Sequence, residues 1–174
     1  NLKIFGSQGH VAYPQRANNP STTIVQILKE IKEITFDKGT KNFQPTNLEV
    51  TKININNTAD NVIPGIAEAT FNIRFNNKHS SNSLKKKLNK IFSKISKKNK
   101  SKFKIDYRVS GEAFLTKPNK TTYMIQNTIK KITKIKPKLS TTGGTSDLRF
   151  IKAISPGLEF GLVGKTMHRV DEVV

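Results

Sequence analysis

The sequence predicts an α/β fold built on a ferredoxin-like core, and three observations lead to this prediction. Residues 1–108 contain four segments with strand character, of which 67–75 alternates apolar and polar residues most regularly. Two further segments, 20–34 and 81–95, repeat apolar residues at helical spacing. Their order is β-α-β-β-α-β, the split βαβ arrangement with two helices on one face of an antiparallel sheet. We therefore expect the other sheet face to be available to a partner.

The first half of this core begins with a strand and a helix. Leu2 and Ile4 alternate with polar neighbours, which predicts the first strand. The segment 6–18 has Gly, Pro and Asn at short intervals, so we expect an irregular loop. Asn19 can then cap a helix, and Pro20 suits its first turn because that turn lacks partners for its N–H groups. The apolar positions of this helix are Ile24, Ile27, Leu28, Ile31 and Ile34.

The second half of the core adds three strands and one helix. After a polar turn over 37–47, the apolar residues of 48–55 change phase once, which predicts a strand with a β-bulge. The regular strand 67–75 follows, and Ser80 or Ser81 can cap the second helix. The fourth strand is marked by the alternating residues Phe103, Ile105 and Tyr107.

Residues 109–174 predict a different and incomplete α/β segment. Helical spacing over 125–135 predicts a third helix that stops before Pro137, since proline cannot continue a helix. A Gly-Gly turn, a short helix around Phe150 and a strand over 158–163 follow. This segment is too short for a closed core, so we expect it to complete a sheet whose other strands lie upstream. The chain is then expected to be the C-terminal portion of a longer protein.

Charge and composition restrict the classes of function. Lys and Arg number 31 against 12 Asp and Glu, a formal net charge of +19. This charge suits an anionic partner, but we favour a Lys-, Asn- and Ile-rich compositional drift, because charge alone governs solubility and non-specific attraction. The absence of cysteine excludes disulfides and thiolate ligands, and no apolar run approaches the roughly 18 residues of a membrane span. We expect a cytoplasmic location, with neither nucleic acid nor membrane as partner.

Four short motifs carry the candidate chemistry. They are Gly-His-Val-Ala-Tyr-Pro at 9–14, Asn-Val-Ile-Pro at 61–64, Thr-Gly-Gly-Thr-Ser-Asp at 142–147 and Gly-Leu-Val-Gly-Lys-Thr-Met-His at 161–168. Taken alone, each has an ordinary explanation, since a lone histidine is more often structural than a ligand. In this order and at these spacings, they resemble the zinc-dependent deacylases, and within them the desuccinylases that act on N-succinyl-LL-diaminopimelate.

The resemblance implies that the chain contains parts of two domains with different roles. Residues 1–108 match the lid that dimerises these enzymes, and 109–174 match the end of the catalytic domain. His168 corresponds to a zinc-binding histidine of a site that holds two Zn²⁺ ions, with Co²⁺ as a substitute. His10 corresponds to a catalytic histidine that reaches across the homodimer and donates to the oxyanion of the tetrahedral intermediate. Tyr13 would help to shape the same pocket.

The remaining site residues are implied to bind substrate. Asn61 corresponds to an asparagine that faces the substrate across the dimer. Arg74 corresponds to an arginine that clamps a substrate carboxylate, a task suited to the planar guanidinium. Gly144 and Thr145 lie in a glycine turn whose N–H groups would hold a carboxylate.

The implied reaction is zinc-dependent amide hydrolysis, which yields succinate and LL-diaminopimelate for lysine and cell-wall precursor synthesis. A catalytic zinc needs about three protein ligands, and the chain has no His-x-Asp or Glu-Glu motif to add to His168. We therefore expect the isolated chain to be inactive.

Three alternatives stay open. Another deacylase of the superfamily, such as an acetylornithine deacetylase or a peptidase, would share the motifs. An RNA-recognition module would share the βαββαβ order and the charge, but it needs a basic-aromatic signature, and Phe71, Ile73 and Phe75 are expected to face the helices. A non-catalytic dimerisation module would retain the lid alone.

Overall fold

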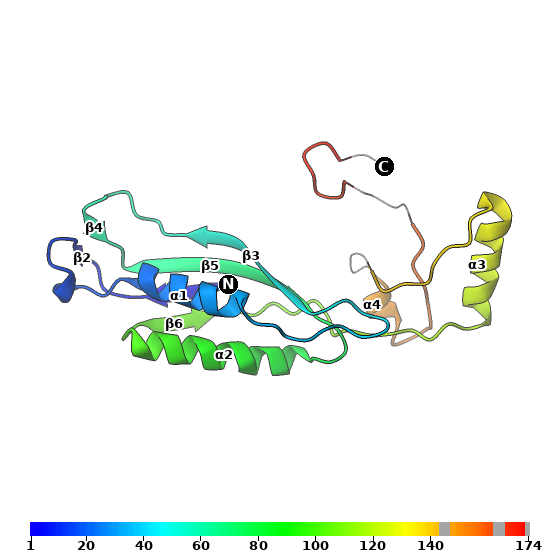
Figure 1. Ribbon diagram of the computed structural model, residues 1–174, viewed down its shortest axis with the longest axis horizontal. Coiled ribbons are helices and arrows are strands. Elements are labelled where there is room, and N and C mark those ends of the chain that lie inside the picture. The colour runs from blue at the N-terminus through cyan, green and yellow to red at the C-terminus, as the bar shows by residue number, and fades with distance from the viewer. Residues whose placement is uncertain (143–146, 162–165, 173–174) are drawn as a thin grey trace. The chain divides into compact units, whose positions relative to one another are not determined.

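The computed structural model describes residues 1–142, 147–161 and 166–172, and it forms two compact units, Asn1–Ala113 and Phe114–Val174 (Figure 1). None of the helices in the described ranges is both long enough and apolar enough to cross a membrane. The elements of the first unit are β1 (Leu2–Phe5), β2 (Gly9–His10), η1 (Pro14–Arg16), α1 (Pro20–Lys32), β3 (Asn47–Asn54), β4 (Val62–Ile63), β5 (Ile66–Arg74), α2 (Ser81–Lys98) and β6 (Lys102–Ile105). The second unit contains α3 (Lys120–Thr133) and α4 (Leu148–Ile151).

The main sheet of the first unit has four antiparallel strands in the order β3-β5-β1-β6. Helices α1 and α2 lie together against one of its faces (Figure 1). This confirms the ferredoxin-like prediction, because the first strand lies in the centre and the chain returns to both of its sides.

The core of this unit fills the space between the sheet and the helices. Leu2 and Ile4 of β1 are completely buried, and the small residues Ala67 and Ala69 beside them on β5 allow the helices to pack closely. Phe92 of α2 is also completely buried. Its ring lies 6.1 Å from that of Phe71 and 5.9 Å from that of Phe103. Tilted and edge-on aromatic contacts of this kind add to the apolar burial.

Both helices of the first unit begin as predicted. The side chain of Asn19 accepts a hydrogen bond from Ser21 N at 2.9 Å, with Pro20 in the first turn. Ser80 caps α2 through a reciprocal capping box with Ser83. Helix α1 ends at Lys32, so Ile34, predicted to continue it, lies beyond its end and packs against the core from there.

Strand β3 contains the predicted bulge. Val50 pairs with Phe71 and Lys52 with Thr70, so Thr51 is the extra residue. The change of phase places Ile53 opposite the buried Ala69, and at this edge of the sheet Ile53 keeps 57% of its surface exposed. An edge strand with an exposed apolar residue is a potential pairing surface.

The segment 6–18 is more ordered than the sequence suggested. Gly9 and His10 form β2, which pairs with β4 in a separate two-stranded sheet, and η1 follows. The prediction of a wholly irregular loop is therefore wrong. Two-residue strands carry no periodicity of their own, and this pairing depends on a partner more than fifty positions away in the chain.

The second unit matches the predicted helices but not the predicted strand. Helix α3 starts at a capping box between Asn119 and Thr122 and ends before Pro137. Within 158–163, the described residues 158–161 form no strand, and the last two lie outside the described residues. That part of the prediction is wrong because a strand needs a paired neighbour, and the described part of this unit contains none.

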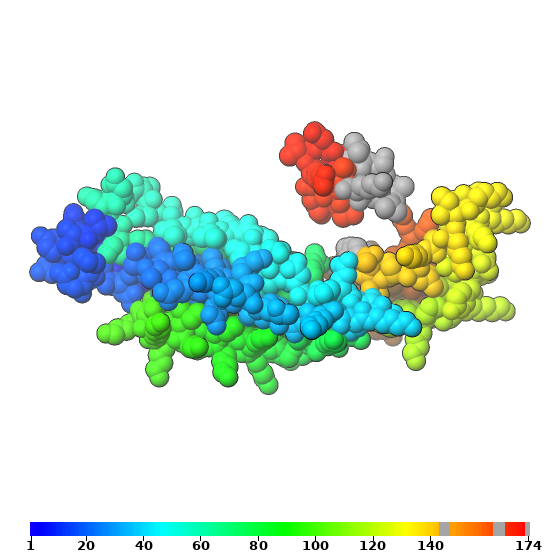
Figure 2. All heavy atoms as spheres, viewed as in Figure 1, coloured from blue at the N-terminus to red at the C-terminus, as the bar shows by residue number. Residues whose placement is uncertain are grey.

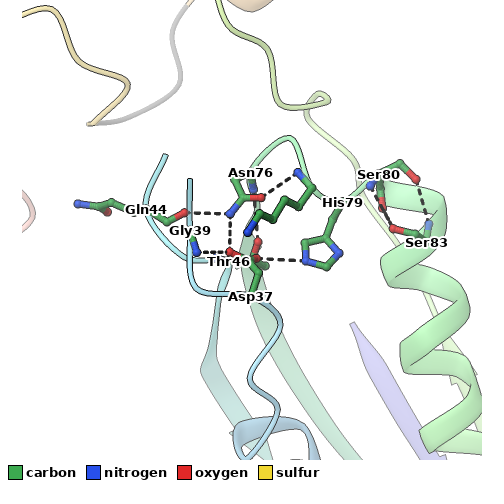
Figure 3. Close-up of polar contacts among 9 residues, drawn as sticks. Asp37, Gly39, Gln44, Thr46, Asn76, His79, Ser80 and Ser83 are labelled. Carbon is green, nitrogen blue, oxygen red and sulfur yellow. Dashed lines mark hydrogen bonds and ion pairs between the residues drawn. The ribbon is translucent and has the colours of Figure 1, made fainter. Parts of the chain in front are cut away.

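A cluster of polar contacts orders the predicted turn over 37–47 (Figure 3). Asp37, whose side chain is only 6% exposed, accepts from Gly39 N and Asn76 Nδ2 through Oδ1, at 2.5 and 2.7 Å. Its Oδ2 accepts from Thr46 N at 3.2 Å and lies 3.1 Å from His79 Nε2. The side chain of His79 is only 19% exposed, because it packs against this carboxylate.

The cluster favours the charged form of Asp37. Burial by itself would raise its pKa, but the hydrogen bonds from Thr46, Asn76 and Gly39 outweigh burial and hold the pKa well below its usual range. A lowered folded-state pKa stabilises the fold at pH values above the unfolded-state value near 4. This stabilisation is lost as the pH falls below that value toward the folded-state pKa.

We predict that Asp37→Asn lowers the free energy of unfolding by about 2–4 kcal/mol at pH 7, because an amide nitrogen would face the donors that the carboxylate satisfies. Urea unfolding followed by circular dichroism would measure the loss. The difference from the wild type should narrow below about pH 4, where the unfolded chain takes up the proton. Asp106→Asn, at an exposed aspartate of the same unit, is the control, and an equal loss there would contradict the prediction.

Candidate functional site

The second sheet of the first unit belongs to a projecting feature that we call the arm, residues 9–16 and 57–63. Gly9 pairs with Ile63 and His10 with Val62, and Val11 N donates to Asn61 O at 3.0 Å. Figure 2 shows the arm, dark blue and teal, at one extremity of this unit. Gly9 is needed at this pairing because a Cβ atom there would lie 2.7 Å from Ala17 Cβ.

The backbone of the arm sets the hydrogen-bonding state of His10. Ala12 N donates to His10 Nδ1 at 3.1 Å, and Tyr13 N donates to His10 O at 2.9 Å. Because Nδ1 accepts a hydrogen bond, the proton of the neutral ring is on Nε2. The exposed side chain of His10 therefore presents an N–H donor on an ordered turn.

Tyr13 and Arg16 continue from His10 along the arm. The rings of His10 and Tyr13 are 6.1 Å apart, and the Arg16 guanidinium lies 5.2 Å from the centre of the Tyr13 ring. Arg16 N donates to Tyr13 O at 3.0 Å, which fixes the short helix η1. Tyr13 is 52% exposed and Val11 46%, so the arm exposes aromatic and apolar groups beside its polar ones.

Asn57 holds the other half of the arm in place, and the sequence analysis did not identify it. Its side-chain amide donates to Val62 O at 2.7 Å and to Ala59 O at 3.0 Å. These two bonds close the loop that carries Asn61 and present β4 to His10. An asparagine shortly after a strand is a turn signal, although one residue type in an Asn-rich loop could not have singled it out.

Arg74 lies away from the arm. It is the last residue of β5 and pairs with Asn47, whereas β4 and the arm precede the first residue of that strand. At about 3.3 Å per residue, Ile66 and Arg74 are about 26 Å apart. The structure thus brings together three predicted site residues, His10, Tyr13 and Asn61, and places Arg74 at the opposite end of the sheet.

The second unit holds the remaining predicted residues. His168 lies in a turn with φ 62°, a left-handed conformation, and its backbone N donates to Glu172 Oε2 at 3.2 Å. Gly144 and Thr145 lie outside the described residues. Across 1–142, 147–161 and 166–172, no group of three or more His, Cys, Asp or Glu side chains gathers to hold a metal ion. Among those residues, His168 is thus a candidate for one ligand of a larger set.

The four-stranded sheet, the two helices on one of its faces and the arm together define a small α/β domain. Residues 1–100 match the family of the peptidase dimerisation domain, and the chain belongs to that family.

Curated relatives extend the similarity over nearly the whole chain. The succinyl-diaminopimelate desuccinylase of Pelagibacter ubique is 80% identical over 173 residues, which cover 99% of this chain and 45% of the relative. Those of Parvibaculum lavamentivorans and Rickettsia bellii are 47% and 45% identical, over 98% of this chain and 43% and 44% of their own lengths. The chain thus spans a little less than half of the curated relatives it matches.

Solved structures support the fold. A tripeptidase from Staphylococcus aureus superposes with a TM-score of 0.76 at 16% identity, covering 98% of this chain and 44% of that one. An aminopeptidase from Bacillus cereus superposes with a TM-score of 0.67 at 15% identity, covering 87% and 39%.

We predict that Asn57→Ala loosens the arm without unfolding the domain. Loss of the two bonds from its amide should speed hydrogen exchange at Val11 N, which bonds to the loop that Asn57 closes, by about five- to tenfold. Hydrogen exchange followed by NMR would measure this, with an amide of β1 as internal reference. Asn56→Ala is the matched control, and equal exchange in the two variants would show that Asn57 does not hold the arm.

Proposed function

We propose that the protein carrying this chain is a zinc-dependent desuccinylase. Its reaction is hydrolysis of N-succinyl-LL-diaminopimelate to succinate and LL-diaminopimelate, in lysine and diaminopimelate synthesis in the cytoplasm. The 80% identity to a relative of that name supports this substrate. The structural observation that carries the proposal is the arm, which presents His10 Nε2–H as a donor at an exposed tip.

The separation of the site residues supports a site shared between two copies. His10 and Arg74 lie at opposite ends of a sheet about 26 Å long, a distance greater than the length of the proposed substrate. In one chain they cannot both contact it. In a homodimer, His10, Tyr13 and Asn61 of one copy would meet Arg74 of the other, as expected when two lid domains pair around a two-fold axis.

The surface beside β3 suits that pairing. Strand β3 is at one edge of the sheet, and in the described structure only β5 pairs with it. Beside it, α1 leaves Val25 61% exposed and β3 leaves Ile53 57% exposed. A groove joins the two elements, lined by Val25, Leu28, Lys29, Lys32, Glu49, Val50 and Ile53. The opposite edge strand, β6, carries lysines, which would repel one another across a two-fold axis.

The chain's residues would perform separate tasks in the reaction. Bound zinc would activate the attacking water, and His168 would supply one of its ligands, with the others from the part of the protein that this chain does not span. His10 would donate its Nε2–H to the oxyanion that forms at the succinyl carbonyl, a donor already positioned before the charge develops. Tyr13 and Asn61 would contact the substrate from the same copy. Arg74, with the N–H groups of Gly144 and Thr145, would hold carboxylates.

A complementation experiment tests the shared site. We predict that His10→Ala and His168→Ala, each made in the protein expressed with its upstream reading frame, both lose succinate release by more than about a hundredfold. An equal mixture, allowed to exchange subunits, should recover roughly a quarter of wild-type activity, because half of the dimers hold one site with both histidines. Release of succinate from N-succinyl-LL-diaminopimelate is the measurement.

The outcomes separate the parts of the proposal. No recovery in the mixture, with stable dimers present, would show that His10 serves its own copy. Activity on N-acetylornithine alone would keep the metallohydrolase and overturn the substrate. No activity on either compound, with no bound zinc in the wild type, would favour a non-catalytic dimerisation module.

We predict that Ile53→Glu, which places a charge on the apolar groove at the β3 edge, weakens the homodimer at least tenfold. Sedimentation velocity over a concentration series would show a shift toward monomer with an unchanged circular dichroism spectrum. Met124→Glu, at an exposed apolar residue of α3, is the control. Equal dissociation of both variants, or of neither, would place the interface elsewhere.

A further inference from the structure

Arg16 is a cation on the arm that the sequence motifs leave without a role. It is exposed, and across the described part of the chain no carboxylate lies within ion-pair distance of it. The Arg16 guanidinium lies over the ring of Tyr13, 5.2 Å from the ring centre. The arm therefore presents an arginine whose charge is available to a ligand.

The position of Arg16 is set by its surroundings. It ends η1, where Arg16 N bonds to Tyr13 O and Ala17 N bonds to Pro14 O, at 3.0 and 3.1 Å. Stacking on an aromatic ring restricts the guanidinium while leaving its N–H groups free to bind in the plane. Less side-chain freedom then remains to be lost when an anion binds.

The contacts along the arm keep Arg16 within the reach of a substrate held at His10. His10, Tyr13 and Arg16 follow one another at 6.1 Å and 5.2 Å. In N-succinyl-LL-diaminopimelate, six covalent bonds separate the amide nitrogen from the far carboxylate, about 7–8 Å when extended. With His10 at the amide carbonyl, the far carboxylate can reach the guanidinium of the same arm.

We propose that Arg16 is a specificity-determining residue that binds the far carboxylate of the diaminopimelate end of the substrate, in the site of the partner copy. This inference rests on the proposed function and adds to it the group that distinguishes diaminopimelate from an amino acid with one carboxylate. A bidentate guanidinium–carboxylate pair is strong and directional, so it can select for that second carboxylate. Arg74, at the other end of the sheet, remains available for a different carboxylate.

The ordinary alternative is that Arg16 only steadies the ring of Tyr13. The two roles predict different kinetics. A steadying role would affect every substrate of the site in proportion, whereas a carboxylate clamp acts only on substrates that carry the far carboxylate.

The test compares two substrates in the protein expressed with its upstream reading frame. One is N-succinyl-LL-diaminopimelate, and the other is Nα-succinyl-L-lysine, which lacks the far carboxylate. Arg16→Gln should raise KM about tenfold for the first substrate, change it less than about twofold for the second, and leave kcat within about threefold for both. Arg16→Lys keeps the positive charge but loses the planar guanidinium, so its KM for the first substrate should lie between those of the wild type and Arg16→Gln. Lys86→Gln removes one exposed positive charge from α2 and should change neither KM.

Each result bears on the proposal. An Arg16→Gln variant with the same KM as Lys86→Gln on both substrates would overturn it. A proportional loss on both substrates would overturn it in favour of the steadying role. If the wild type hydrolyses neither substrate, the proposed function fails first and this inference falls with it. A wild type active on N-succinyl-LL-diaminopimelate with an unaffected variant overturns the inference alone.

Discussion

The antiparallel pairing of β1 with β5 is the constraint on which the rest of the first unit depends. These two strands form the middle of the sheet, carry buried residues against both helices and run directly into the arm. Their pairing ends at Phe5 and Ile66, continues through the Gly6 N to Gly65 O bond at 2.9 Å, and resumes at β2 and β4. A slip of one residue would turn the whole buried face outward and move His10 with it. The same register of strand pairing therefore fixes both the buried face of the core and the position of the arm.

Most of the core could be predicted because its signals are local. Short stretches of sequence are enough to show these signals. They are the periodicities of two and 3.6 residues, the phase change in β3 and the caps at Asn19 and Ser80. The strands of the arm and the Asp37 cluster could not be predicted in this way, since each joins residues tens of positions apart in the chain. Within the strand expected at 158–163, the described residues 158–161 form no strand for the opposite reason, because a strand-like pattern without a paired neighbour in the described part of the unit forms no strand.

The candidate site divides in the same way. His10, Tyr13 and Asn61 stood in recognisable motifs, and the structure gathers them on the arm. The tautomer of His10 and the loop closure by Asn57 depend on individual hydrogen bonds. A pattern of residue types in the sequence does not predict such bonds. Arg74 was predicted from its correspondence to a carboxylate-binding arginine, and the length of β5 places it at the end of the sheet away from the arm.

The lysines of β6 have a consequence for assembly as a whole. A sheet with two receptive edges can add copies at both, which leads toward open-ended stacking, whereas a sheet with one receptive edge stops once that edge is filled. Lys102 and Lys104 lie on the edge strand opposite β3, beside a helix that carries no acidic residue. The excess of positive charge at this edge opposes the pairing of a further copy with β6. In the proposed homodimer, the β3 edge can therefore pair with a second copy without further copies adding at β6.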